Sequence, residues 1–269
     1  MSTETSPAVP PGAPFPRGTF TPDPGVGSRA RMLVVHTRTE TVLALRHSEQ
    51  LLLTLVIPLA LLVGLTLLRG LVALPDPRVD AALGTVLALA MMSTGFTSQA
   101  IALGFDRHYG LMRRLAATAI PRWLVVTGRL GGMAAVVVIQ IVVLGGVALL
   151  LGWRPEAGAV GWALLLVVLG AAAFGACGLL LGGSVRADLV LVIANVVWFV
   201  LLFVGGIVVP AAQLPAPVGA VVGLLPSGAL ADGLRTVLLG GTPAVSQLVV
   251  LVVWAVVAGF AAARALRWD

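Results

Sequence analysis

The stretch AVGWALLLVVLGAAAFGACGLLLGG, residues 159–183, contains no charged side chain. A helix needs about 20 apolar residues to cross the hydrocarbon core of a bilayer, so this stretch is long enough to span one. Its apolar residues run continuously and do not alternate with a period of two, which favours a helix over a strand of a membrane barrel. The stretch therefore predicts a transmembrane helix.

The rest of the chain has the same character. Its 269 residues are 59% hydrophobic and only 10% charged, with a mean hydropathy of +1.05, whereas about 25% of the residues in a soluble domain are charged. We therefore expect an all-α polytopic membrane protein with six transmembrane helices. The predicted spans are 51–73, 81–103, 124–151, 159–183, 189–210 and 246–264, which together make a six-span membrane domain over 51–269.

The segments before the first span have a different composition. Residues 1–28 are rich in proline and predict a disordered cytoplasmic tail. Residues 29–50 predict a weakly amphipathic helix, because at helical spacing several apolar side chains fall on one side. We expect this helix to lie along the cytoplasmic membrane surface. Its apolar side carries Met32, Val35, Val42 and Leu43.

The segment 211–245 is too apolar for an ordinary loop and is broken by Pro215, Pro217 and Pro226. Irregular backbone is tolerated at membrane depth only where protein or water covers it. We expect a pair of short re-entrant helices before the last span, and the alternative is an apolar surface loop. In the fourth span, small residues recur at helical spacing and predict close helix packing. They are Ala171, Gly175, Gly178 and Gly182.

The distribution of arginine predicts the orientation, because cytoplasmic loops are enriched in basic residues. The six spans leave 13 of the 17 arginines on the side of the N-terminus. Both termini are therefore predicted to be cytoplasmic. This bias also explains the net charge of +6 without nucleic acid as a partner. The other side keeps only Arg69, Arg78, Arg154 and Arg235.

The absence of lysine excludes two kinds of chemistry. A Walker A loop needs a lysine for the nucleotide phosphates, and a Schiff base needs one as nucleophile, but all 17 basic residues here are arginine. Any nucleotide-driven step must use another chain. The single cysteine, Cys177, lies in an apolar run, so we expect no metal site and no intrachain disulfide. We predict no catalytic residue.

Few polar residues lie inside the predicted spans. Arg129 is close enough to the third span's start to reach the cytoplasmic face. Gln99, Gln140 and Asn195 are embedded. Such residues line a translocation path for an amphipathic solute or hydrogen-bond neighbouring helices, and the sequence leaves both roles open.

The stretch GFDRHYGLMRRLAATAIPRW, residues 104–123, gathers charge between the second and third spans. Read as one helix over 104–117, it has an apolar face with Phe105, Tyr109 and Met112, while Arg107 and Arg114 point the other way. A short amphipathic helix at this place lies in the lipid headgroups or docks into a groove of a soluble partner.

Two motifs resemble the membrane subunits of ABC-2 type transporters, including drug-resistance permeases of the daunorubicin type. The first motif consists of DRHYG, then RRL, then a proline and a basic residue. Within it, His108 stands where the family usually has glutamate. The second follows the fifth span. The matching residues are Asp106, Arg107, Gly110, Arg113, Arg114, Leu115, Pro121 and Arg129 in the first motif, and Gly206, Pro210, Leu214, Pro215, Leu225, Pro226 and Arg235 in the second.

The resemblance implies a permease in the plasma membrane of a bacterium that exports its substrate. It implies two copies of a separate ATPase subunit, which bind ATP and magnesium so that this chain carries no cofactor, and a second membrane subunit, identical or homologous. The implied ATPase contacts are Phe105, Asp106, Arg107, Tyr109, Gly110, Met112, Arg113, Arg114 and Leu115, with Arg186 in the next cytoplasmic loop.

Two other functions remain open at this point. One is an ATP-independent channel or secondary carrier for a hydrophobic solute, in which the 104–117 segment lies on lipid. A proton-coupled carrier would need a titratable group at depth, and the predicted spans hold none in their middle. The other is a membrane enzyme of lipid or polyprenyl metabolism. That reaction needs clustered acids or histidines, whereas the acids here are scattered.

Overall fold

The computed structural model describes residues 28–46, 48–68, 74–111, 114, 117 and 122–265, and within these ranges it gives no side-chain placement for 48–53, 122 and 123. The predicted tail therefore lies outside the described residues, except for Ser28. The described part is helical and contains no strand. The helices are α1 Arg29–Arg46, α2 Ser48–Leu67, α3 Arg78–Met91, η1 Met92–Thr97, α4 Ser98–His108, α6 Arg122–Leu150, α7 Ala157–Ser184, α8 Ala187–Phe203, η2 Ala211–Gln213, α9 Ala216–Gly223, α10 Pro226–Gly240 and α11 Val245–Ala265.

Four helical segments are long and apolar enough to cross a membrane, and α9 with α10, bent by 94°, counts as a fifth if the pair is one span. These spans confirm an all-α, multi-pass membrane protein. Two further apolar helices, Thr54–Leu67 and Ala187–Phe203, are shorter. Each of the six predicted spans contains a helix, but the count of six stays a prediction. The four long segments are Arg78–His108, Leu124–Leu150, Ala157–Ser184 and Val245–Ala265.

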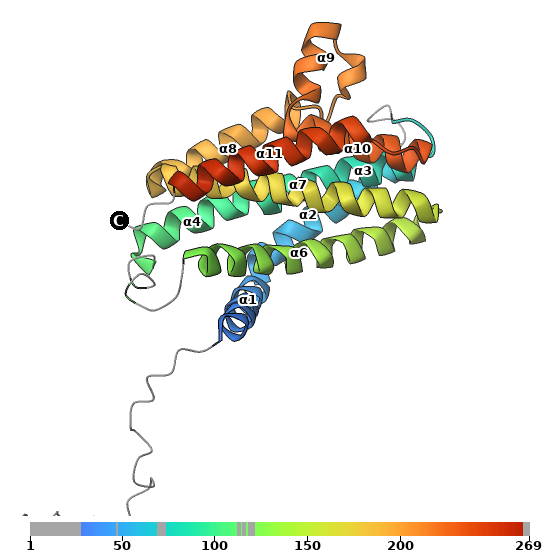
Figure 1. Ribbon diagram of the computed structural model, residues 1–269. Helices are drawn as coiled ribbons and strands as arrows, with labels where there is room; N and C mark the ends of the chain where they lie inside the picture. Colours follow the sequence, from blue (N-terminus) through green and yellow to red (C-terminus); the bar gives the residue numbers. More distant parts are fainter. Residues whose placement is uncertain are drawn as a thin grey trace, which may run out of the picture.

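Helix α7 lies at the centre of the bundle and packs against α11, α4, η1 and α10 (Figure 1). Its small residues permit this approach. A Cβ built on Gly178 would lie 2.6 Å from the carbonyl oxygen of Phe96, and one on Gly182 would lie 2.5 Å from that of Ala100. The predicted packing face at these glycines is therefore confirmed.

Helix α1 crosses α6 outside the main bundle (Figure 1). Its polar side packs closely against three glycines of α6. A Cβ on Gly128 would clash with His36, one on Gly131 with Thr37, and one on Gly132 with Glu40. The opposite, apolar side of α1 is exposed, including Val34 and Val35 at 65% and 56%. The helix predicted over 29–50 is thus present over Arg29–Arg46, and its place at the membrane surface stays a prediction.

The segment predicted to hold two short helices contains α9 and α10. Helix α10 is one of the more buried elements, with Pro226 to Ala231 all buried, and it packs against α3. The alternative of an apolar surface loop is therefore wrong for α10. Helix α9 projects from the bundle (Figure 1).

The end of α4, the start of α6 and the C-terminal end of α11 lie together at one end of the bundle, which we call the loop end (Figure 1). The connection between α6 and α7 lies at the opposite end. This arrangement agrees with a predicted cytoplasmic face that gathers the end of α4, the start of α6 and the end of α11. Which side of the membrane the loop end faces stays a prediction.

Candidate functional site

The charged stretch at the loop end begins as the last turn of a membrane helix. Helix α4 continues α3 and η1 and ends at His108, with Tyr109 as its C-cap. Gly110 follows with φ of +70°, the left-handed conformation that ends helices at glycine. The expected single helix over 104–117 is therefore wrong, because this turn separates residues 104–108 from those that follow.

An exposed aromatic group remains at this turn. Phe105 and Tyr109 are 38% and 70% exposed, and their stacked rings have centroids 6.2 Å apart. The His108 ring meets that of Tyr109 edge-on at 5.3 Å. Leu111 is exposed beside them. Two members of the predicted apolar face, Phe105 and Tyr109, are thus exposed side by side, although no single helix over 104–117 carries them.

Only part of the basic pair after the turn can be placed. Met112, Arg113 and Leu115 lie outside the described residues. Arg114 is exposed, and its backbone N–H donates to the carbonyl of Gly110 at 3.2 Å.

Arg107 was predicted to lie on the face opposite Phe105 and Tyr109, and the structure shows that its guanidinium contacts another helix. Its Nη1 donates to the carbonyl oxygens of Gly182 at 3.0 Å and of Val185 at 3.2 Å. These carbonyls belong to the C-terminal end of α7, where unpaired carbonyls and the helix dipole favour a cation. Arg107 therefore ties the end of α4 to the end of α7.

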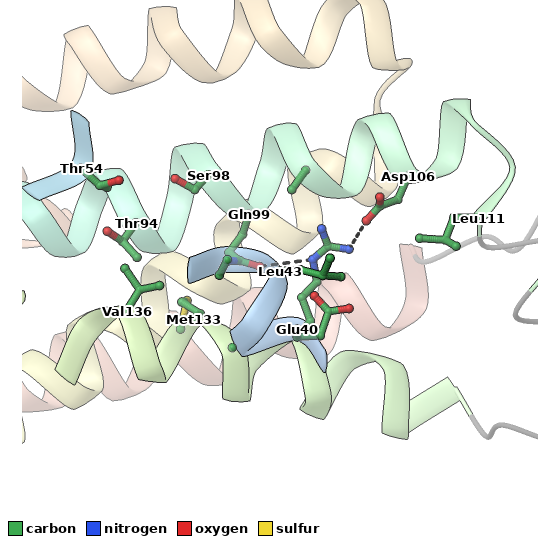
Figure 2. Close-up of a pocket in the computed structure, with 14 residues that line it drawn as sticks. Glu40, Leu43, Thr54, Thr94, Ser98, Gln99, Asp106, Leu111, Met133 and Val136 are labelled. Carbon is green, nitrogen blue, oxygen red and sulfur yellow. Dashed lines mark hydrogen bonds and ion pairs between the residues drawn. The ribbon is translucent and has the colours of Figure 1, made fainter. Parts of the chain in front are cut away.

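Asp106 forms the shortest described ion pair at the loop end. Its Oδ2 lies 2.6 Å from Nη1 of Arg129, and Nε of Arg129 donates to Oε1 of Gln99 at 3.3 Å (Figure 2). The Arg129 side chain is only 10% exposed. The sequence allowed Arg129 to reach the cytoplasmic face; in the structure its largely buried side chain is held by a partner on the neighbouring helix.

A polar cavity of about 250 Å³ surrounds this pair (Figure 2). Its lining comes from α1, α2, η1, α4 and α6. Glu40 of α1 faces it together with Asp106 and Arg129. Gln99 lines this cavity and accepts a hydrogen bond from Arg129.

The other two embedded polar residues, Gln140 and Asn195, lie in different parts of the bundle. Gln140 is 1% exposed, donates to the carbonyl of Thr54 at 3.1 Å, and exchanges hydrogen bonds with Thr94. It joins α2, η1 and α6, which agrees with the predicted role in helix association. Asn195 of α8 is exposed, and its Nδ2 donates to the carbonyl of Leu191.

Asn195 lines a second cavity of about 600 Å³, which we call the apolar chamber. Side chains of α2, α3, η1, α4 and α8 and of residues 207–208 form it, and none of those lining it is charged. The three embedded polar residues thus do not share one cavity. Typical apolar lining residues are Ile57, Leu61, Leu89, Phe199 and Leu202.

Arg186 opens α8 at the second predicted cytoplasmic loop. Its Nη2 lies 3.4 Å from Oδ2 of Asp188, and both side chains are exposed, at 81% and 63%. The hydrogen bonds from Arg107 to Gly182 and Val185 place this loop next to the end of α4. The two predicted contact regions are therefore neighbours.

The burial of Arg235 was not predicted by the sequence analysis. Arg235, expected on the outer side, is 8% exposed and pairs with Asp232 at 3.0 Å. It also donates to the carbonyls of Gly206 and Ile207, where the chain leaves α8. The signal was the second motif, which carries both Gly206 and Arg235, but the sequence could not show that they touch.

The comparison with protein families agrees with this architecture: the model described as ABC-2 type transporter matches residues 32–239. The chain belongs to the ABC-2 type transporter family. It is the membrane permease component of an ABC-type transporter, and its domain is one of transport and not of catalysis. Among curated proteins, none matches the chain.

The match to the ABC-2 family includes most of the irregular features described above. The match begins within α1 and ends within α10, so it includes the turn at Gly110, the ion pair of Asp106 with Arg129, and the Arg235 cluster. It leaves α11 outside.

Proposed function

We propose that this chain forms half of the translocation pathway of an ATP-driven exporter, and that a separate ATPase subunit docks at the loop end. The observation that supports docking is the exposed, stacked pair Phe105 and Tyr109. Exposed aromatic residues favour protein interfaces, because they bury a large area at a small loss of conformational freedom. Met112, Arg113, Arg114 and Leu115 complete the proposed contact, with Arg186 in the adjacent loop.

The end of α4 is built to transmit a displacement. Arg78–His108 is one continuous helical segment of 31 residues, so a push at Tyr109 moves a rod whose other end packs against α10 and α2. Arg107 links this rod to α7, and Asp106 links it to α6 through Arg129. ATPase docking would therefore act on α6 and α7 through two polar contacts, and on α2 and α10 through packing.

The apolar chamber is the proposed half-pathway. It lies between α2, α3 and α8 and is lined mainly by apolar side chains, with a few hydroxyls and Asn195. A second copy of the chain, or a homologous permease, would complete it, since closed two-fold assemblies are the commonest oligomers. The bacterial plasma membrane is the proposed location, and ATP with magnesium would be bound by the two ATPase subunits alone.

Docking is tested by Tyr109→Asp and Arg114→Glu, measured as the ATP turnover of the cognate ATPase reconstituted with the permease in lipid nanodiscs. Each change should abolish most of the stimulation by the permease, because it places a negative charge within the proposed contact. Arg154→Glu, at an exposed position between α6 and α7, is the matched control and should leave stimulation intact. Full stimulation with both loop-end variants would refute docking at this surface.

A further inference from the structure

Helix α1 has an outward face that combines apolar and basic side chains. At about 100° per residue, six further residues of α1 point within about 60° of the direction of Arg31. All of them are exposed, and the three valines and the leucine among them expose 41–65% of their surface. We call this face the arginine–valine stripe. Its members are Arg31, Val34, Val35, Arg38, Val42, Leu45 and Arg46.

The stripe contains no acidic residue that would balance its arginines. Glu40 is the only acidic residue of α1, and it lies on the opposite side of the helix, where a Cβ built on Gly132 of α6 would be 2.9 Å from the Cβ of Glu40. Among the side chains that the structure describes, none forms an ion pair with Arg31, Arg38 or Arg46. The outward face of α1 therefore carries a positive charge.

The position of α1 along the bundle suits the headgroup region of a bilayer. Helix α6 has 29 residues, so it is about 43 Å long, close to the thickness of a bilayer with its headgroups. Helix α1 packs against Gly128, Gly131 and Gly132, which lie within ten residues of Arg122, where α6 begins at the loop end. These glycines are about 9–15 Å from that end of α6, near the boundary between headgroups and hydrocarbon.

At this depth the two kinds of side chain in the stripe complement each other. Valine side chains can enter the edge of the hydrocarbon, while arginine stems run along it and carry the guanidinium groups to the phosphates. A guanidinium group binds a phosphate through two parallel hydrogen bonds. A zwitterionic phospholipid balances its own phosphate with an ammonium group, whereas an anionic phospholipid keeps a net negative charge that attracts basic residues.

We infer that the arginine–valine stripe is a binding surface for anionic phospholipids and enriches them next to α1. Arg31 and Arg46 lie about 22 Å apart along the helix, so the stripe can contact more than one headgroup. A second copy of the chain docked here by two-fold symmetry would bring two arginine stripes together, which repulsion between like charges disfavours. This inference does not depend on ATPase docking.

The test measures which lipid lies next to Thr39, which is exposed beside the stripe. On a Cys177→Ala background, Thr39→Cys is labelled with bimane, and the full-length chain is reconstituted into phosphatidylcholine vesicles. Quenching is compared for doxyl-labelled phosphatidylglycerol and doxyl-labelled phosphatidylcholine at equal mole fraction. The anionic lipid should be enriched roughly two- to fivefold, because one basic residue near an anionic surface contributes a factor of about five. Salt at about 1 M should remove most of this preference.

Three triple variants separate the stripe from the net charge of the chain. Glutamine in place of the three stripe arginines should make the two lipids quench equally, whereas lysine at the same positions should keep the preference. The matched control removes three exposed arginines elsewhere at the loop end and should also keep the preference. The stripe variants are Arg31→Gln/Arg38→Gln/Arg46→Gln and Arg31→Lys/Arg38→Lys/Arg46→Lys, and the control is Arg114→Gln/Arg186→Gln/Arg264→Gln.

Equal quenching by the two lipids with the stripe unaltered, a preference that survives the glutamine changes, or its loss in the matched control would overturn the inference. A label that neither lipid quenches would place protein on this face, such as a second copy of the chain, and would overturn it as well. These results would leave ATPase docking standing, since the vesicles contain no ATPase. Full ATPase stimulation in the loop-end variants would in turn leave the lipid preference unchanged.

Discussion

Arg129 and Asp106 show how a charged residue becomes tolerable inside this chain. The guanidinium is largely buried, and the carboxylate at 2.6 Å and the Gln99 amide supply its partners. Either charge alone would be poorly solvated, because desolvation penalises an unpaired ion. The Asp106 side chain is 30% exposed, so water screens part of the interaction.

Removing both partners of this pair should therefore cost less than the sum of removing each alone. We expect Arg129→Gln and Asp106→Asn each to lower the melting temperature of the purified permease. The melting temperature of the double variant should fall by less than the sum of the two single falls, since the double variant leaves no unpaired charge. Additive losses across this double-mutant cycle would show that the two residues do not interact. Thermal unfolding followed by circular dichroism provides the measurement.

At the scale of single residues, the sequence indicated which polar residues are important better than it indicated what their side chains contact. Gln140 was given two roles, and its hydrogen bonds to α2 and η1 favour the one in helix association. Arg107, Arg129 and Arg235 were assigned to faces or loops from their position along the chain. All three are instead held by groups distant in sequence, which periodicity cannot reveal.

At the scale of the elements, long apolar runs predicted the helices because the bilayer demands them. The end of α4 was missed for a local reason. The segment 104–117 has a helical pattern of aromatic and basic residues, but Gly110 adopts a positive φ within it. A glycine inside an otherwise amphipathic pattern permits both a continuous helix and a turn, and tertiary contacts at Arg107 favour the turn.

The packing of α7 against α4 makes a prediction about two glycines of one helix. Gly182→Ala should destabilise the protein, because the added methyl would lie 2.5 Å from the Ala100 carbonyl and force the helices apart. Gly161→Ala, where no atom lies within 4 Å, should be neutral or stabilising by up to about 1 kcal/mol. The melting temperatures of the two variants provide the comparison. Equal effects would mean that α7 and α4 do not pack closely.

At the scale of the whole molecule, the bundle has one end with the aromatic turn and the Arg186 loop, and another with the connection between α6 and α7. The arginine bias predicts that the first of these ends is cytoplasmic. The position of each loop along the bundle follows from the structure, whereas the side of the membrane follows only from charge.

Cysteine labelling in intact cells tests this orientation, on a Cys177→Ala background that removes the single native thiol. A membrane-impermeant thiol reagent should modify Arg154→Cys from outside. Tyr109→Cys should react only after the cells are permeabilised. Modification of Tyr109→Cys in intact cells would reverse the orientation and remove the proposed ATPase contact.

Helix η1, Met92–Thr97, is a π-helix that joins α3 to α4, and it changes how the bundle packs. A π turn accommodates one more residue than a regular turn, and one residue corresponds to about 100° of rotation. The side chains of α4 are therefore rotated about the helix axis relative to those of α3, although both belong to one continuous helical segment. Because of this offset, one continuous helical segment packs one side of α3 against α10 and another side of α4 against α7 and α8.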